Sequence, residues 1–210
     1  MIEKLACKLG RNDERPNIEL AEYLCQYKDT AGIREIVDGL TDKDKAVAND
    51  CIKVLYEIGG RNPELICEYA NVFIFCLYSK NNRLVWGGMT ALAKIAAHSS
   101  QLIYEKFDAV KTAYDNGSTI TVDNSISVFA ELCKASDEYS KTVLPILLNH
   151  LRKCKPKEVP QHAERASVCF SKQNANDFIE VLEKRNPHLA ASQQTRINKL
   201  LKTLNGLHQK

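Results

Sequence analysis

Hydrophobic residues recur along the chain at spacings of three and four, the pattern of one face of an α-helix. One stretch places apolar or small residues at positions 48, 51, 52, 55, 58 and 59. The pattern returns at intervals of 37 residues, so that VLYEI at 54–58 aligns with ALAKI at 91–95 and VFAEL at 128–132. This periodicity predicts three equivalent amphipathic helices within a repeat.

A second amphipathic helix is predicted after each of these, separated from it by a polar break. The second helices are expected over residues 63–78, 100–114 and 137–152. Asn62 is a suitable N-cap, and Pro63 suits the first helical position. The apolar positions Phe73, Val110 and Leu147 again lie 37 residues apart. The repeating unit is therefore predicted to be a helical hairpin.

The two ends of the chain are less regular, as terminal repeats often are. We expect a brief helix over 2–9 that Gly10 ends, and helices over 159–170 and 174–185 near the other end. The run STITVD at 118–123 favours β-structure by composition, but we interpret it as a loop and N-cap. We predict one repeat domain over 1–210, with an N-terminal cap at 1–16, repeats at 17–190 and a C-terminal capping helix at 191–210.

The repeat of two antiparallel helices with a polar turn, DKDKAV or KNNRLV, resembles the HEAT and armadillo families over about residues 15–190. This resemblance implies an all-α, right-handed α-solenoid (an α-α superhelix) of about five two-helix repeats, with second helices lining a concave surface. Many HEAT units carry an aspartate in the turn. Here Asp44 is present, but Asn81 and Ser118 stand at the equivalent places, so the choice between HEAT and armadillo stays open.

The composition is that of an ordinary soluble protein, with 44% hydrophobic and 26% charged residues in 210. The longest apolar runs, such as 70–78, are shorter than the ~20 residues that span a bilayer, so we expect a cytoplasmic protein without a membrane segment. The eight cysteines form no CxxC pair and mostly occupy apolar helical positions. We expect them to be core residues in a reducing compartment.

The sequence carries no motif that demands an enzyme, since it contains no G-x-S-x-G, Walker or H-E-x-x-H pattern. Four potential metal ligands fall within 20 residues, but prolines intervene and the spacing matches no established zinc pattern. They are His150, Cys154, His162 and Cys169. We therefore expect no cofactor and no metal, with His150 exposed to solvent and Cys169 in the core.

Charge is unevenly distributed. Residues 1–140 carry 16 Lys and Arg against 21 Asp and Glu, whereas residues 141–210 carry 13 against 5. Some HEAT-like solenoids, including the DNA alkylation-repair glycosylases, hold duplex DNA on a basic concave face, and the basic end could supply phosphate contacts. Those glycosylases resemble one another in several tryptophans, whereas this chain has only Trp86. Nucleic-acid binding is thus the alternative to a protein or peptide partner.

The candidate binding residues are those that the helical core does not need. Phe75 aligns with Thr112 and Asn149, and Tyr78 with Asp115 and Arg152. If these positions face solvent, two aromatic side chains are exposed side by side, and aromatic residues and arginine are the usual anchors of interfaces. The alternative is that Phe75 packs on the adjacent repeat. The predicted binding residues are Phe75, Tyr78, Trp86, Asp123 and Arg152 of a non-enzymatic scaffold.

Two glycines follow Trp86 inside a predicted helix. Gly88 aligns with Cys51 and Ser125, so its position takes a small side chain in each repeat and is expected to lie where two helices approach closely. Gly87 aligns with the polar residues at 50 and 124 and is expected to face solvent, as is Trp86. The identity of the partner and the oligomeric state are left open.

Overall fold

The computed structural model describes residues 1–208, in which all regular secondary structure is helical. The chain divides into two compact units, Met1–Ser125 and Ile126–Lys210. We refer to them as unit 1 and unit 2. The predicted capping helix corresponds to α12, Ala191–His208, and residues 209–210 of that prediction lie outside the described residues. The prediction of a single domain, the repeat number and the exact period stay predictions.

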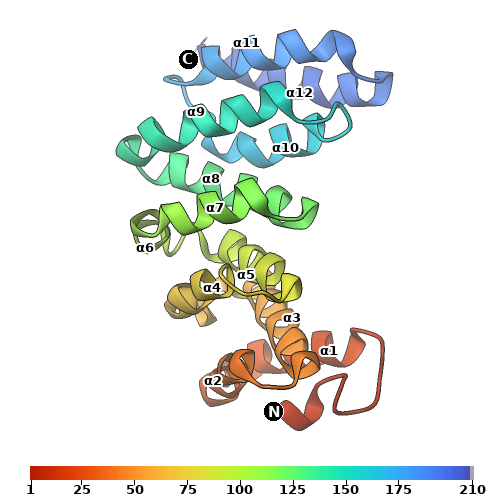
Figure 1. The fold of residues 1–210 in the computed structure, drawn as a ribbon. Coiled ribbons are helices and arrows are strands. Elements are labelled where there is room, and N and C mark those ends of the chain that lie inside the picture. The colour runs from red at the N-terminus through yellow and green to blue at the C-terminus, as the bar shows by residue number, and fades with distance from the viewer. Residues whose placement is uncertain (209–210) are drawn as a thin grey trace. The chain divides into compact units, whose positions relative to one another are not determined.

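Unit 1 is built from helical pairs whose first members pack side by side, α1 against α3 and α3 against α5 (Figure 1). Its elements are η1 (Ile2–Lys4), α1 (Arg15–Tyr27), α2 (Thr30–Asp38), η2 (Gly39–Thr41), α3 (Lys45–Arg61), η3 (Pro63–Leu65), η4 (Cys67–Tyr69), α4 (Ala70–Cys76), α5 (Asn82–Ile95), α6 (Ser100–Glu105) and α7 (Phe107–Asn116). The second-member helix α4 packs against α5.

Unit 2 has the same antiparallel character. Helix α8 begins in unit 1 and continues into unit 2, and in unit 2 α9 packs against α10 and α11, while α12 packs against both α10 and α11. The elements are α8 (Thr119–Ala135), α9 (Asp137–Lys153), α10 (Val159–Ala166), η5 (Ser167–Cys169), α11 (Ala175–Arg185), η6 (Asn186–His188) and α12. In the described residues, no helix is both long and apolar enough to span a membrane.

Short polar side chains explain where the first helices of successive pairs begin. Asp44 Oδ1 accepts from the amide of Ala46 at 2.9 Å and so caps α3, and Asn81 Oδ1 accepts from the amide of Arg83 at 3.1 Å and caps α5. The third equivalent residue is Ser118, whose Oγ accepts from the amide of Thr121, in the first turn of α8, at 3.4 Å. The turn position that varies between Asp, Asn and Ser is therefore an N-cap, which all three residue types can form.

The apolar positions that define the predicted repeat are buried. Its aligned apolar positions have no exposed surface: Leu55, Leu92 and Phe129 in the first helices, and Phe73, Val110 and Leu147 in the second. Four of the eight cysteines, Cys51, Cys76, Cys133 and Cys169, are buried as expected, whereas Cys7, Cys25, Cys67 and Cys154 are only half-buried.

Two of the predicted second helices are broken. The helix expected over 63–78 is two 3-10 segments followed by α4, and the helix expected over 100–114 is interrupted at Lys106 between α6 and α7. The first break lies at Ile66, whose φ of −129° is not helical and whose side chain is fully buried toward Gly59 of α3. Tertiary packing of this isoleucine overrides the helical preference of its neighbours.

Three shorter segments also differ from prediction. The helix expected over 2–9 is regular only as η1, although Gly10 does end it with a left-handed φ of +66°. The helix expected over 159–170 stops at Ala166 and continues as η5. Residues 119–123, interpreted as a loop, are the first turns of α8, because Ser118 caps the helix directly before them.

The paired glycines lie where α5 approaches α3 and α4 closely. A Cβ at position 88 would lie 2.8 Å from Cys76 Cβ and 2.9 Å from the Phe73 carbonyl oxygen of α4, which confirms the packing role of Gly88. The prediction that Gly87 faces solvent is wrong. A Cβ there would lie 2.6 Å from Ile52 Cγ1, because this side of α5 is pressed against α3.

We expect Gly88→Ala to lower the free energy of unfolding by about 1–3 kcal/mol, since the added methyl group meets backbone and a helical Cβ that cannot move freely. The matched control is Gly60→Ala in α3, where the nearest atom to the new Cβ is Lys94 Cε at 3.9 Å. That substitution should be neutral or stabilising by up to about 1 kcal/mol, because alanine favours helix. Urea unfolding of both variants gives the comparison, and equal stabilities would contradict the packing role.

Candidate functional site

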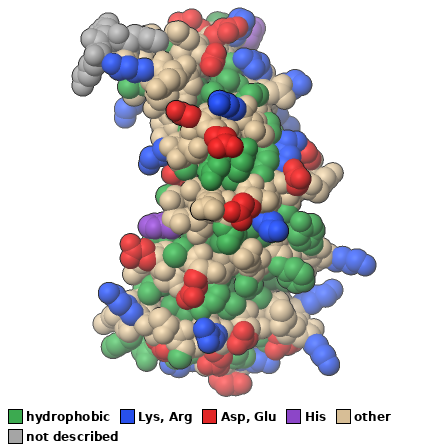
Figure 2. All heavy atoms as spheres, turned by 90° about the vertical axis from the view of Figure 1, so that its left-hand side faces the viewer, with side chains coloured by type: hydrophobic (Ala, Val, Ile, Leu, Met, Phe, Trp, Pro, Cys, Tyr) green, Lys and Arg blue, Asp and Glu red, His purple; other side chains and the backbone are tan. Residues whose placement is uncertain are grey.

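The last turn of α4 and the turn that follows it carry two aromatic side chains that are largely exposed, Phe75 at 70% and Tyr78 at 68%. Both line a pocket of about 290 Å³, which we call the aromatic pocket. Its lining residues are Leu40, Thr41, Val72, Phe75, Cys76, Tyr78, Ser79 and Leu84. Figure 2 shows the side of the molecule that carries α4, where hydrophobic side chains are exposed among charged ones. The predicted exposure of the two aromatics is therefore confirmed.

The end of α4 separates core side chains from exposed ones. Phe73 and Ile74 are buried, whereas Phe75 in the last turn of α4 and Tyr78, two residues beyond the end of the helix, are exposed. Leu40 comes from η2 and Leu84 from α5, so three elements close the pocket. The pocket offers apolar surface for burial and only a few polar atoms.

Trp86 does not have the position that the repeat alignment suggested. It is half-buried, with its ring 5.9 Å from the ring of Tyr56 in α3 and the Arg83 guanidinium 4.5 Å above it. The close contact of α5 with α3 that buries Gly87 also turns the neighbouring tryptophan toward α3. The tryptophan is thus part of a mixed aromatic and charged surface.

An ion-pair network that the sequence analysis missed joins α3 and α5 to Glu14, the residue before α1, and we call it the Lys53 network. The Lys53 ammonium, on a residue only 6% exposed, lies 2.9 Å from Glu14 and 2.8 Å from Glu57. Arg61 and Arg83 add a second partner to Glu57 and Glu14, at 2.6 and 2.5 Å. The spacing of Lys53, Glu57 and Arg61 by four residues was the available sequence signal.

The electrostatic consequence is clearest at Glu57. Burial alone would raise the pKa of this carboxyl group, but the hydrogen bonds from Lys53 and Arg61 outweigh it and lower the pKa from its ordinary value of 4.5. The pKa of Glu14 is lowered in the same way against burial, by Arg83 and Lys53. Both carboxylates are therefore held ionised by the network.

The remaining two predicted site residues lie elsewhere. Asp123 is half-buried in the first turns of α8. Arg152 is exposed in the last turn of α9, in unit 2. Of the five predicted residues, the structure brings Phe75 and Tyr78 into one pocket and sets Trp86 in a separate cluster with Tyr56.

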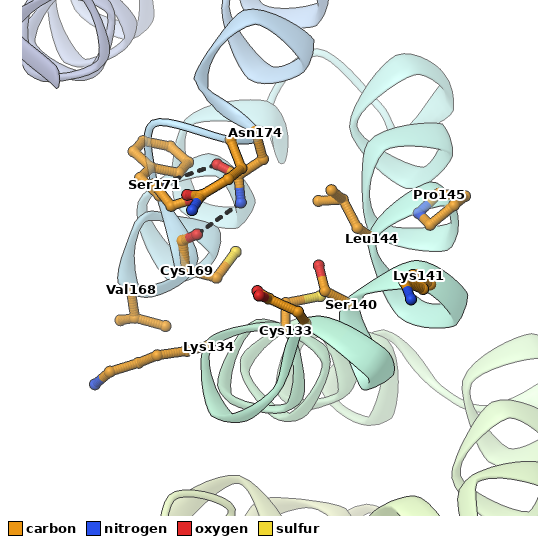
Figure 3. A pocket seen from close by; sticks show the side chains of 13 residues that line it. Cys133, Lys134, Ser140, Lys141, Leu144, Pro145, Val168, Cys169, Ser171 and Asn174 are labelled. Carbon is orange, nitrogen blue, oxygen red and sulfur yellow. Dashed lines mark hydrogen bonds between the residues drawn. The ribbon is translucent and has the colours of Figure 1, made fainter. Parts of the chain in front are cut away.

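Unit 2 holds a larger pocket of about 410 Å³ that Cys133, Ser140 and Cys169 line (Figure 3). Asn174 shapes one side, since its Nδ2 donates to the Cys169 carbonyl at 2.8 Å and its Oδ1 accepts from the Ser171 amide at 2.9 Å. Hydrogen bonds from Cys169 and Ser140 outweigh burial and lower the pKa of the Cys133 thiol. This pocket is more polar than the aromatic pocket.

The prediction of a solvent-exposed His150 is wrong. His150 is 8% exposed, and its Nε2 lies 2.8 Å from Nδ1 of His162, which is 1% exposed. The last turn of α9 packs against the first turns of α10 and thereby buries both rings.

No protein-family model and no curated protein matches the chain. Several solved structures do. A computationally designed armadillo repeat protein for modular peptide recognition is similar with a TM-score of 0.67 and 15% identity, over 90% of each chain. A designed armadillo repeat protein in complex with the peptide (KR)4 has a TM-score of 0.63 and 14% identity, over 89% of this chain and 86% of that one.

A third match is an engineered protein with a TM-score of 0.62 and 18% identity, over 98% of this chain and 96% of the other. These similarities extend over nearly the whole chain and agree with the buried repeat positions. The chain therefore has the all-α solenoid fold of armadillo-like helical repeats, as the pattern of hydrophobic residues predicts.

We expect Glu57→Gln to lower the free energy of unfolding at neutral pH by about 1–2 kcal/mol, because Lys53 and Arg61 each lose a charged acceptor. A carboxyl group with a lowered folded pKa stabilises the fold above its ordinary value of 4.5 and loses that contribution as the pH falls through the folded pKa. The variant should therefore lose less stability than the wild type below pH 4.5.

Urea unfolding followed by the fluorescence of the single tryptophan, Trp86, at a series of pH values measures this difference. The matched control is Glu64→Gln, which removes an exposed carboxylate from η3. If Glu57→Gln and the wild type lost stability in parallel on acidification, the Lys53 network would not contribute to the acid sensitivity of the fold.

Proposed function

We propose that the chain is a non-enzymatic scaffold that binds a protein through a peptide segment, with an apolar side chain of that segment in the aromatic pocket. The observation that carries this proposal is the pair of exposed aromatics, Phe75 and Tyr78, at the mouth of an apolar cavity of about 290 Å³. Exposing two large aromatic side chains to water is unfavourable, and covering them on binding releases that free energy. Aromatic anchors of this kind carry much of the binding energy of known interfaces.

The surroundings of the pocket favour basic residues beside the apolar anchor of the partner. Exposed Asp38 and Asp42 flank Leu40 and Thr41 of the pocket in the sequence, and residues 1–140 carry five more acidic than basic side chains, 21 against 16. Opposite charge at the rim speeds association and fixes orientation more than it adds affinity. We therefore expect moderate salt dependence.

The similar solved structures support this reading by their described uses. One was designed for modular peptide recognition, and another was solved with the peptide (KR)4. The same helical-repeat architecture provides a long surface whose side chains the core does not need. In this chain the aromatic pocket is the apolar part of that surface that we assign to the partner.

Nucleic-acid binding is a second candidate, favoured by a basic segment in unit 2. Arg152, Lys153, Lys155 and Lys157 are all exposed at the end of α9 and just beyond it. Phosphate-driven binding must weaken steeply with salt. A mobility shift on duplex DNA that is lost at high salt, and lost when these four residues are changed to glutamine, would establish this function. An absence of any shift at low salt would exclude it.

The peptide proposal is tested by selecting binders from a random displayed peptide library and measuring their affinities by fluorescence anisotropy. We expect selected peptides to carry an apolar residue next to Lys or Arg. The double variant Phe75→Ala plus Tyr78→Ala should bind them at least about tenfold more weakly, since truncating anchor residues costs 2 kcal/mol or more.

The control is Tyr23→Ala plus Tyr27→Ala, which removes two other exposed aromatics of unit 1 whose ring centroids lie 4.7 Å apart on α1. This variant should bind like the wild type. Peptides that bind both double variants and the wild type equally would place the site elsewhere, whereas a library that yields no binder would contradict peptide recognition itself.

A further inference from the structure

Three metal-ligating side chains lie together within unit 2. His150, Cys154 and His162 each present one ligand atom, and these atoms all lie within 4.8 Å of one another. The two ring nitrogens are His150 Nε2 and His162 Nδ1, 2.8 Å apart. We call this group the His-Cys cluster. It plays no part in the proposed peptide site.

The local fold explains why residues with such irregular spacing meet. His150 and Cys154 are four apart at the end of α9, so they share a helix face. Residues 155–158 then reverse the chain, with the Glu158 amide donating to the Lys155 carbonyl at 2.8 Å. Pro160 lies in the first turn of α10, where a missing N–H costs nothing. The prolines that argued against a metal site in the sequence therefore form the turn that assembles it.

The backbone around the cluster is held by other hydrogen bonds. The Cys154 amide donates to the His150 carbonyl at 2.8 Å, and the His162 amide donates to the Glu158 carbonyl at 3.0 Å. The guanidinium of Arg185, from α11, donates to the carbonyl oxygens of Arg152 and Cys154. The three ligands thus stand on positions that α9, α10 and α11 fix together, as a preformed site requires.

The geometry of the cluster points to a metal ion. Zinc bonds of about 2.0–2.1 Å to nitrogen and about 2.3 Å to sulfur, arranged tetrahedrally, place two nitrogens about 3.3 Å apart and nitrogen and sulfur about 3.6 Å apart. The cluster is close to these separations, with 2.8 Å between the two nitrogens and at most 4.8 Å between any two of the three ligand atoms. We propose that His150 Nε2, His162 Nδ1 and Cys154 Sγ bind one zinc ion.

The donor set selects the class of metal. Two imidazole nitrogens and one thiolate suit zinc and similar borderline divalent ions, whereas magnesium and calcium require oxygen ligands. On binding, the Cys154 thiol releases its proton to solvent. One of the two hydrogen-bonded ring nitrogens of His150 and His162 carries a hydrogen. That nitrogen becomes a ligand when the hydrogen moves to the other nitrogen of the same ring, which is a change of tautomer. One proton is therefore released for each zinc ion bound.

Three protein ligands leave a fourth tetrahedral position for water or for an external ligand. The two histidines are buried and Cys154 is half-buried, so the ion enters and exchanges from the side of the cysteine. The bound ion then joins the end of α9 to the start of α10 as a clip in unit 2.

The proposal is tested on the full chain, produced without a histidine tag and freed of metal by a chelator. Equilibrium dialysis against zinc should give one bound ion per chain. Titration with cobalt(II), a spectroscopic substitute for zinc, should give a sulfur-to-metal charge-transfer band together with the visible bands of a tetrahedral site. Zinc bound well below one equivalent, or cobalt spectra without a sulfur band, would overturn the proposal.

Substitutions in the His-Cys cluster test whether its side chains hold the bound zinc ion. Cys154→Ser and His162→Gln should each weaken zinc binding by more than about tenfold, because even residues behind a ligand contribute 10–100-fold. The controls are Cys67→Ser and His98→Gln, which change a half-buried cysteine and an exposed histidine of unit 1 and should bind like the wild type. Equal binding by all four variants would refute the site.

A measurement on the wild type alone guards against variants that fail to fold. Zinc should slow alkylation of Cys154, mapped by mass spectrometry, while the other seven cysteines in the same sample serve as internal controls. Unchanged alkylation of Cys154 at saturating zinc would contradict the assignment even if the chain bound zinc.

Discussion

The arrangement of unit 1 depends on how closely α5 approaches its neighbours. Gly87 allows α5 to lie against Ile52 of α3, and Gly88 allows it to lie against Phe73 and Cys76 of α4. Any larger residue at either position would hold the helices apart. This double contact fixes the rotation of α5 about its own axis, and with it the direction in which every other side chain of the helix points.

Two surfaces of different chemistry follow from that rotation. Leu84 lines the aromatic pocket with Phe75 and Tyr78. Trp86 instead contacts Tyr56 of α3, and Arg83 pairs with Glu14, which directly precedes α1. Apolar burial is therefore available on one side and charge pairing on the other. Lys53 keeps its charge in a nearly buried position because two carboxylates are within 3 Å, and a buried cation without such partners would be strongly unfavourable.

The sequence was sufficient to predict an all-helical repeat fold, the burial of its aligned apolar positions and the exposure of Phe75 and Tyr78, because one face of each helix must be apolar to pack in the core. It was insufficient where contacts between separate segments decide the outcome. Ile66 breaks a helix by packing toward α3, Trp86 turns toward Tyr56, and His150 is buried by α10. No pattern in the local sequence indicates these contacts, and the prolines near His162 argued against the metal site that we propose.

The ion pair between Glu14 and Arg83 joins residues 69 positions apart, from the segment before α1 to the start of α5. In an ideal repeat array each unit touches only its neighbours, and unfolding can spread inward from one end in steps. Here a contact passes over an intermediate helical pair, and Lys53 of that pair shares the same carboxylate. Fraying of the N-terminal segment is thereby coupled in free energy to α5, which makes unit 1 unfold with greater cooperativity than a simple nearest-neighbour stack.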